Sequence, residues 1–255
     1  MTILAGFSCS SGAILCADTQ ETVGYAKRNV SKIEVREESD NEFRIAIAAA
    51  GSGPYADKIS QELFGAICAY KEYNPESIIS CIESVVTEFH SKHFWPRAGV
   101  QDTGYVELLI LLQPTKDDVV PGFPGHPLLL HVAETAVNIV QETKTVGIGS
   151  WLADYILDRL YLGYGNRNYM AALGSYLIKE VRENVEGCGK DAEIIFFGSD
   201  GTWEDISGSD KLAFLEKHVE DINSVFSTVF FHIGQIPLSI PTKRIEASSE
   251  IDNII

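Results

Sequence analysis

The sequence predicts an α+β fold in which two antiparallel β-sheets lie between pairs of helices, as a four-layer αββα sandwich. The order of the predicted elements supports this: strands, two helices, strands, two helices and strands again. No internal repeat or linker-like segment interrupts the 255 residues, and a hydrophobic content of 45% is sufficient for a large core. We therefore predict a single domain over residues 2–255, with a loosely packed tail from about residue 235.

The first predicted element is a β-hairpin at the N-terminus. Two short apolar runs, residues 3–7 and 13–17, flank the segment 10–12, whose Ser-Ser-Gly composition is typical of a turn. Antiparallel pairing of these strands would bring Asp18, at the end of the second strand, beside Thr2 at the start of the first. The hairpin therefore predicts a carboxylate next to a threonine hydroxyl.

The remaining elements follow from hydrophobic periodicity and from the residues that typically end strands and helices. The charged segment 34–41 is interpreted as a solvated turn, and segment 114–127, rich in Pro, Gly and Asp, as a loop or an extended hairpin tip. Strands are predicted at residues 43–50, 105–113, 128–132, 136–142, 146–150 and 192–197. Helices are predicted at residues 56–70, 75–89, 151–161, 167–185 and 210–231.

Composition and charge exclude several classes of partner. The net charge of −16 argues against nucleic acid and anionic membranes, because binding to phosphate groups requires clustered cations. No apolar run reaches the roughly eighteen residues of a transmembrane helix, and no secretory signal is apparent. The five cysteines are odd in number and lack CxxC spacing, as is typical of reduced thiols. We therefore expect a cytoplasmic protein.

Thr2, Asp18 and Lys32 together indicate nucleophilic chemistry at the N-terminus. A threonine hydroxyl is a weak nucleophile and needs a base. An α-amino group has a pKa of about 7.7–8.0, so its neutral form can take the proton near pH 7. A neighbouring Lys32 would lower the pKa of the amine by charge repulsion, and Asp18 would hold that lysine in place. This chemistry requires removal of Met1, because an amide nitrogen is not a base.

Three segments carry a resemblance to a known family. Residues 2–6 (TILAG), 17–20 (ADTQ) and 30–33 (VSKI) resemble the opening of a proteasome β-type subunit, and the Asp-x-Gln form is similar to the HslV-type peptidase. Both are N-terminal nucleophile hydrolases, whose fold has the αββα order. The resemblance covers about residues 2–206. It implies Thr2 as nucleophile, with Asp18 and Lys32 as the charged pair behind it.

The resemblance also implies roles for residues elsewhere in the chain. Gly51, at a strand-to-helix junction, would supply an oxyanion-hole N–H, although glycine is also common in plain turns of this kind. Ser150 would bond near the nucleophile's amine, or cap the helix that follows it. Asn184 and Gly187 stand where the family usually has Asp and Ser. They are expected to weaken the positioning of the amine, or to form only a helix end and a turn.

No cofactor and no metal are predicted. The run 147–150 resembles the start of a dinucleotide-binding GxGxxG loop, but Leu152 replaces the third glycine and no clear βαβ unit surrounds it. His90 and His93 lie three residues apart without a third ligand at a suitable spacing for a metal ion.

Three functions remain in competition. The first is a threonine-type endopeptidase that acts on peptides or unfolded proteins, as a subunit of a homo-oligomeric ring fed by an ATP-dependent unfoldase. The second is a catalytically impaired ring scaffold, which the departures at Asn184 and Gly187 favour. The third is an amidase of the same nucleophile class that acts on small substrates.

Overall fold

The computed structural model describes residues 2–37, 43–70, 74–97, 105–114, 126–218, 225 and 228. The chain divides into a unit of residues 1–217 and a unit of residues 218–255. Almost all of the second unit, including the predicted tail from residue 235, lies outside the described residues. The prediction of a single domain is therefore not tested, and the arrangement below is that of the first unit.

The first unit has an α+β fold with three antiparallel sheets. One five-stranded sheet has the order β10-β1-β2-β11-β12, a second has the order β5-β6-β7-β8-β9, and β3 and β4 form a two-stranded sheet. The strands of the first sheet are β1 (Ile3–Cys9), β2 (Gly12–Asp18), β10 (Thr143–Gly147), β11 (Ala192–Gly198) and β12 (Trp203–Asp205). The others are β3 (Gln20–Val23), β4 (Ala26–Asn29), β5 (Ile33–Glu37), β6 (Phe43–Gly51), β7 (Val106–Pro114), β8 (Leu128–Ala133) and β9 (Ala136–Ile139).

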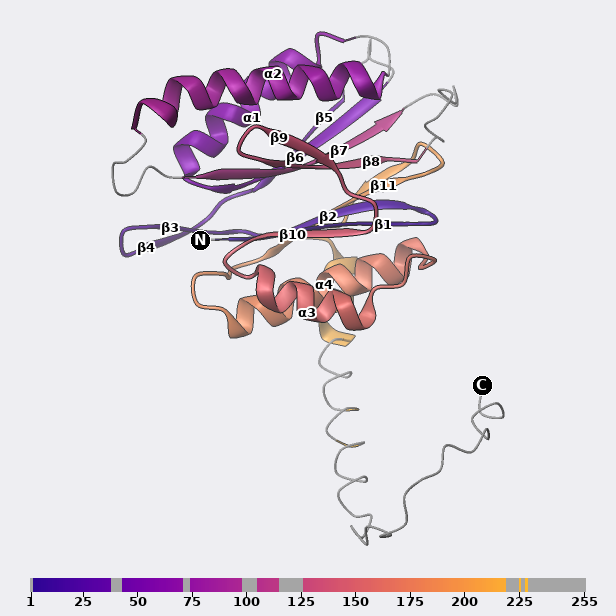
Figure 1. Ribbon diagram of the computed structural model, residues 1–255. Helices are drawn as coiled ribbons and strands as arrows, with labels where there is room; N and C mark the ends of the chain where they lie inside the picture. The colour runs from indigo at the N-terminus through magenta and orange to yellow at the C-terminus, as the bar shows by residue number, and fades with distance from the viewer. Residues whose placement is uncertain are drawn as a thin grey trace, which may run out of the picture. The chain divides into compact units, whose positions relative to one another are not determined.

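Helices cover the outer face of each large sheet (Figure 1). Helices α1 (Gly53–Ile67) and α2 (Pro75–His93) lie over the second sheet, and α3 (Ser150–Leu160) and α4 (Arg167–Asn184) lie over the first. Asn74 begins α2 by accepting a hydrogen bond from the N–H of Ser77, a common way to satisfy a free amide at a helix start. A short 3₁₀ helix, Trp95–Arg97, follows α2. No helix among the described residues is long and apolar enough to span a membrane.

Three apolar cores result from the alternation of side chains along the strands. Leu4 of β1 and the odd-numbered apolar residues of β2 meet residues of β6 and β7 between the sheets. This core includes Leu4, Leu15, Ala48, Leu109 and Phe197. The opposite face of the first sheet packs on α3 and α4, and that of the second sheet packs on α1 and α2. The two sheets therefore face each other across an apolar interior, which constrains where their ends meet.

The N-terminal hairpin is confirmed: β1 pairs with β2, and Leu4 lies opposite Ala17. The interpretation of segment 34–41 as a turn is wrong over residues 34–37, which form most of β5. The charges of Glu34 and Arg36 indicated a solvated turn. They instead alternate along a strand with Ile33 and Val35, which face the core between the sheets. Helical structure is present at residues 210–218, while most of the rest of the predicted last helix lies outside the described residues.

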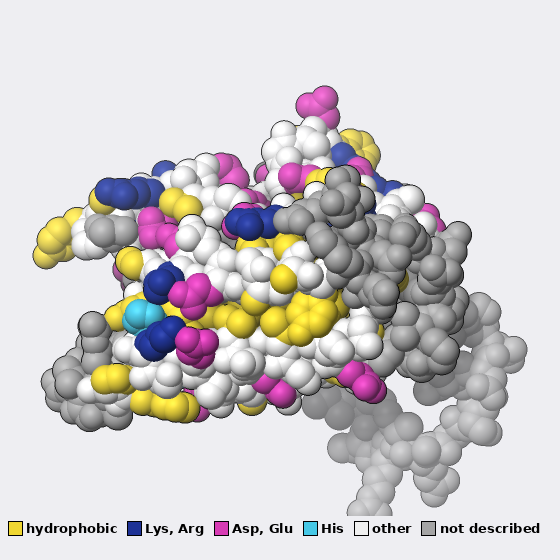
Figure 2. Space-filling view, turned by 90° about the horizontal axis from the view of Figure 1, so that it is seen from above, with side chains coloured by type: hydrophobic (Ala, Val, Ile, Leu, Met, Phe, Trp, Pro, Cys, Tyr) yellow, Lys and Arg dark blue, Asp and Glu magenta, His cyan; other side chains and the backbone are white. Residues whose placement is uncertain are grey.

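Figure 2 shows the molecule from the side of α1 and α2. Acidic and basic side chains are mixed on this face, in keeping with the ion pairs Lys58–Glu62 and Glu88–Lys92, each one helical turn apart. A band of hydrophobic side chains lies between them.

Candidate active site

The carboxylate of Asp18 is the centre of the candidate site. It ends β2, is fully buried, and receives hydrogen bonds on both oxygens. Its Oδ1 accepts from Thr2 Oγ1 at 3.1 Å, from the N–H of Ile3 at 3.0 Å and from Lys32 Nζ at 2.6 Å. Its Oδ2 accepts from the N–H of Gly189 at 2.9 Å and of Gln20 at 3.3 Å. The carboxylate therefore joins the nucleophile candidate to the predicted lysine.

Thr2 lies directly before β1 and is itself buried, with 6% of its surface exposed. The hairpin places it: β1 and β2 are paired up to Leu4 and Ala17, so the next residues along, Ile3 and Asp18, are adjacent. Met1, which precedes Thr2, lies outside the described residues. The expectation that the hairpin would bring Thr2 and Asp18 together is confirmed as geometry.

Lys32 lies between β4 and β5, and its side chain is only 10% exposed. Burial lowers the pKa of its ammonium group, and the attraction of Asp18 opposes this shift. The pair is a buried salt bridge, so its two charges depend on each other: either one left alone would be costly in the interior.

The loop between α4 and β11, residues 185–191, also contacts the site. Gln20 Nε2 donates to the backbone oxygen of Gly187 at 3.1 Å, which fastens the loop to β3. Cys188 lies in the same loop and is buried. Burial raises the pKa of its thiol to about 12; Asp18 adds to this shift and Lys32 opposes it. The thiol is therefore protonated near neutral pH and is no competing nucleophile.

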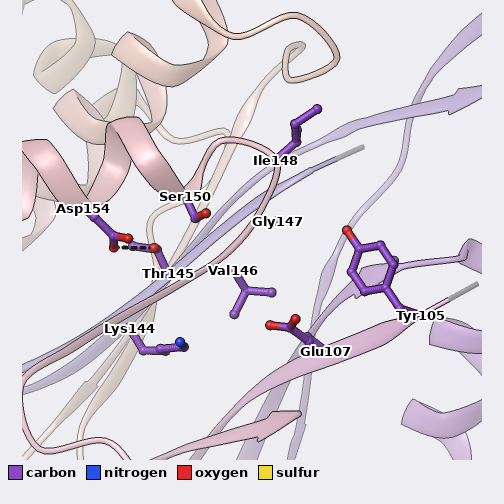
Figure 3. Close-up of a pocket in the computed structure, with 10 residues that line it drawn as sticks. Tyr105, Glu107, Lys144, Thr145, Val146, Gly147, Ile148, Ser150 and Asp154 are labelled. Atoms are coloured by element: carbon purple, nitrogen blue, oxygen red, sulfur yellow. Dashed lines mark hydrogen bonds between the residues drawn. The ribbon is translucent and has the colours of Figure 1, made fainter. Parts of the chain in front are cut away.

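Two cavities flank the site and share one residue, Gly51. A cleft of about 710 Å³ is lined by Thr2, Lys32 and the β6–α1 junction around Gly51. A second cavity of about 580 Å³ is lined by Gly51 together with Ser150 and the end of β10 (Figure 3). In this second cavity Thr145 donates a hydrogen bond to Asp154 at 2.5 Å. The structure thus brings Thr2, Lys32 and Gly51 to the lining of one cleft, with Asp18 buried behind Thr2 and Lys32.

Gly51 requires a backbone that other residues rarely adopt. Its φ is +121°, and a Cβ here would collide with the carbonyl of Tyr105. The glycine is therefore needed for the shape of the β6–α1 junction. Its role in stabilising an oxyanion remains a prediction.

The structure gives less support to the predicted roles of Ser150 and Asn184. The N-cap of α3 is Gly149, so the reading of Ser150 as the capping residue is wrong; Ser150 is the first residue of the helix and no cap hydrogen bond comes from a side chain. The side chain of Asn184 donates to the backbone oxygen of Glu180 at 2.8 Å, within its own helix. It is exposed, and none of its hydrogen bonds in the described structure leads to Thr2. We therefore leave Asn184 out of the proposed site.

Within the described residues, no group of three or more His, Cys, Asp and Glu side chains is arranged to hold a metal ion. The run 147–150 forms the end of β10 and the start of α3.

Solved structures with the same arrangement are known. An Anbu protein from Yersinia bercovieri, described as an ancestral β-subunit, is 13% identical, with a TM-score of 0.72 over 92% of this chain and 98% of that chain. The fold is that of Anbu. The Anbu complex from Pseudomonas aeruginosa, described as a helical assembly, is 12% identical, with a TM-score of 0.76 over 94% of this chain and 100% of that one. A Gly-1 mutant of Anbu from Hyphomicrobium sp. strain MC1 is 14% identical, with a TM-score of 0.70 over 90% and 99%.

No protein-family model and no curated protein matches the sequence. The assignment to a proteasome β-type or HslV-type peptidase subunit is wrong, because the structures to which this chain is similar are Anbu proteins. At 12–14% identity the likeness shows the fold alone. The three short segments were too few residues to separate these related groups.

Two contacts that hold the site were not predicted from the sequence: one is to Asp18 and the other to the backbone of Lys32. The N–H of Gly189 reaches Asp18 from 171 positions away, and no local pattern predicts such a contact. Glu193 was counted only as part of a strand, although it holds the backbone of Lys32. A charged residue near the start of an otherwise apolar strand was the available signal.

Lys32→Met separates catalysis from folding better than Asp18→Asn does. In Lys32→Met the carboxylate of Asp18 keeps its hydrogen bonds from Thr2 and from three backbone amides. Asp18→Asn instead leaves the lysine as an unpaired buried charge, which costs about 3–5 kcal/mol of folding stability. If Thr2 cleaves peptides as predicted, we expect Lys32→Met to lower the rate of peptide hydrolysis about 100-fold or more. Its loss of folding stability should be smaller than that of Asp18→Asn. Rates and thermal melts on the same samples measure both.

The double variant Asp18→Asn/Lys32→Met should lose little more hydrolytic activity than either single variant, because Asp18 and Lys32 act as one unit. Lys32→Arg should restore little, since the broad guanidinium does not replace a compact ammonium. A large fall in melting temperature with unchanged activity per folded molecule would show that the pair is only structural.

Proposed function

We propose that this protein is a threonine-type hydrolase that cleaves peptide bonds with Thr2 as its N-terminal nucleophile, after removal of Met1. One observation carries the proposal: the Thr2 hydroxyl lies 3.1 Å from a buried carboxylate that holds Lys32 at 2.6 Å, on the wall of a cleft. The order of helix pair, sheet, sheet and helix pair supports assignment to the N-terminal nucleophile hydrolase type of fold.

The proposed reaction begins at Thr2 Oγ1. Its proton passes to the free α-amine as the oxygen attacks the carbonyl carbon, and the N–H of Gly51 stabilises the oxyanion. The amine then gives the proton to the leaving nitrogen as the C–N bond breaks, which leaves an ester on Thr2. Water attacks this ester with the amine as base and regenerates the hydroxyl. The ammonium of Lys32 lowers the pKa of the amine, so that it is neutral near pH 7.

A catalytically impaired subunit is the second candidate. The side chain of Asn184 is occupied within its own helix, and Gly187 offers only its backbone to the site. If the amine is poorly positioned without these side chains, the fold could serve assembly alone.

Replacing Thr2 decides between these candidates. Thr2→Ala should abolish hydrolysis because the nucleophile is lost, whereas Thr2→Ser should retain part of it. Both variants should melt close to the wild type, since only a small side chain is changed. Intact mass measured on the wild type should show a chain that begins at Thr2. Unchanged peptidase activity in Thr2→Ala would contradict the proposal.

The charge of the cleft indicates which peptides it accepts. Its lining carries the carboxylates of Glu21, Glu34 and Asp57, and its only cation among the described residues is Lys32, which is already paired with Asp18. Glu34 has its own partner, Arg36, at 2.8 Å. In the described part of the chain no ion pair occupies the carboxylates of Glu21 and Asp57. They are placed to attract a positive charge, so we propose substrates with Lys or Arg near the scissile bond.

We expect a preference of about tenfold in kcat/KM for a basic over an acidic residue before the scissile bond, since a partly exposed ion pair contributes about 1 kcal/mol. Paired fluorogenic peptides that differ at this position measure it. Glu21→Gln combined with Asp57→Asn should remove the preference, and added salt should weaken it. Equal rates on both peptides would show that the carboxylates do not select substrates.

We further propose that the chain assembles with copies of itself, as a closed ring or as an open helix. The support is the shared fold with the Pseudomonas aeruginosa Anbu complex, which is described as a helical assembly. Closed rings and open helices both arise from head-to-tail contacts between identical chains. A substrate chain would then reach the cleft inside the assembly, and an ATP-dependent unfoldase is a candidate partner.

Sedimentation velocity tests the assembly. A species much larger than the 28.0 kDa chain is expected at micromolar concentration, and its size distribution separates a closed ring from an open helix. A lone monomer throughout this range would contradict the proposal.

A further inference from the structure

Glu193 is a charged residue on the inner face of an apolar strand. It lies near the start of β11, two and four residues before Ile195 and Phe197, which pack in the core between the sheets. Because alternate residues of a strand share a face, Glu193 points from the first sheet toward the second. A half-buried carboxylate at this position needs hydrogen-bond donors, and it finds them in the backbone where the chain enters β5.

Those donors belong to Lys32 and its neighbour. Glu193 Oε2 accepts from the N–H of Lys32 at 2.7 Å and from the N–H of Ile33 at 3.2 Å. Ile33 is the first residue of β5, so the carboxylate of Glu193 binds the backbone at the point where the chain enters the second sheet.

Lys32 is thereby held from three strands. Its N–H is bound by Glu193 of β11, its C=O accepts from the N–H of Ala49 of β6 at 3.4 Å, and its ammonium binds Asp18 of β2 at 2.6 Å. The contact from Ala49 is the longest of the three. The short bond from Lys32 to Glu193 is therefore the main anchor of its backbone.

We propose that Glu193 is a positioning residue for Lys32: its carboxylate fixes the lysine backbone at the distance from which the ammonium reaches Asp18. Glu193 is not itself among the residues that line the cleft, and none of its hydrogen bonds in the described structure runs to Thr2. It binds the backbone of two lining residues, Lys32 and Ile33, and of these only Lys32 carries a group that bonds Asp18. The effect of Glu193 on catalysis rests on the function proposed above, whereas its effect on the geometry of Lys32 does not.

The charge of Glu193 adds a second effect. Asp18, Cys188 and Glu193 are the titratable groups that raise the pKa of Lys32 against the lowering by burial. Removing the charge of Glu193 while keeping its oxygen should therefore lower the pKa of Lys32 further. The alkaline limb of the activity profile, where Lys32 loses its proton, should then move to lower pH.

Two variants at Glu193 separate hydrogen bonding from charge. Glu193→Ala removes the oxygen that accepts both hydrogen bonds, whereas Glu193→Gln keeps an acceptor oxygen and removes the charge. Glu183→Ala, on the exposed face of α4, is the control. We expect Glu193→Ala to lower kcat about tenfold to 100-fold with KM unchanged, because a small misplacement of a catalytic group has effects of this size. Glu193→Gln should keep kcat at its optimum and show the shifted alkaline limb.

Hydrogen exchange gives a readout that does not depend on activity. The amides of Lys32 and Ile33 should exchange faster in Glu193→Ala and at nearly the wild-type rate in Glu193→Gln, with no change in Glu183→Ala. Unchanged exchange at Lys32 and Ile33 in Glu193→Ala would overturn the inference. If Glu193→Ala does not fold, an unshifted alkaline limb in Glu193→Gln would overturn it instead. A wild type without hydrolase activity would defeat the proposed function, while the exchange result would still decide the role of Glu193.

Discussion

The buried carboxylate of Asp18 is the interaction on which the rest of the site depends. An ionised carboxylate in the interior is costly unless it is paired and fully hydrogen-bonded. Asp18 meets both conditions with donors from the start of β1, from the residue before β5 and from the loop after α4. Segments far apart in the sequence thus converge because one charge must be satisfied.

This requirement couples the two sheets at their ends. The core between them is apolar, and hydrophobic burial has no direction of its own by which to orient polar groups at that end. The polar contacts of Lys32 supply this orientation, since they run to β2 and β11 in the first sheet and to β6 in the second. Hydrophobic burial provides the stability of the fold, and the polar contacts provide the placement of the site.

The sequence was sufficient for the parts that depend on short-range patterns. The hairpin from β1 to β2 follows from two apolar runs around a turn, and it placed Thr2 beside Asp18 correctly. The prediction that Lys32 lies beside Asp18 came from the family resemblance and not from the spacing of the two residues. The contacts of Gly189 and Glu193 could not be predicted, because they join distant segments through backbone amides. The edge strand β5 was missed because its exposed face is charged.

The burial of Thr2 has a practical consequence for making the protein. The residue lies at the very start of β1, with its hydroxyl directed at Asp18 and the cleft beside it. Any extension that is not removed together with Met1 would leave the nitrogen of Thr2 as an amide, which is not the base that the proposed reaction requires. Affinity tags and fluorescent fusions therefore belong at the C-terminal end, beyond residue 217, where the compact unit with the site has ended.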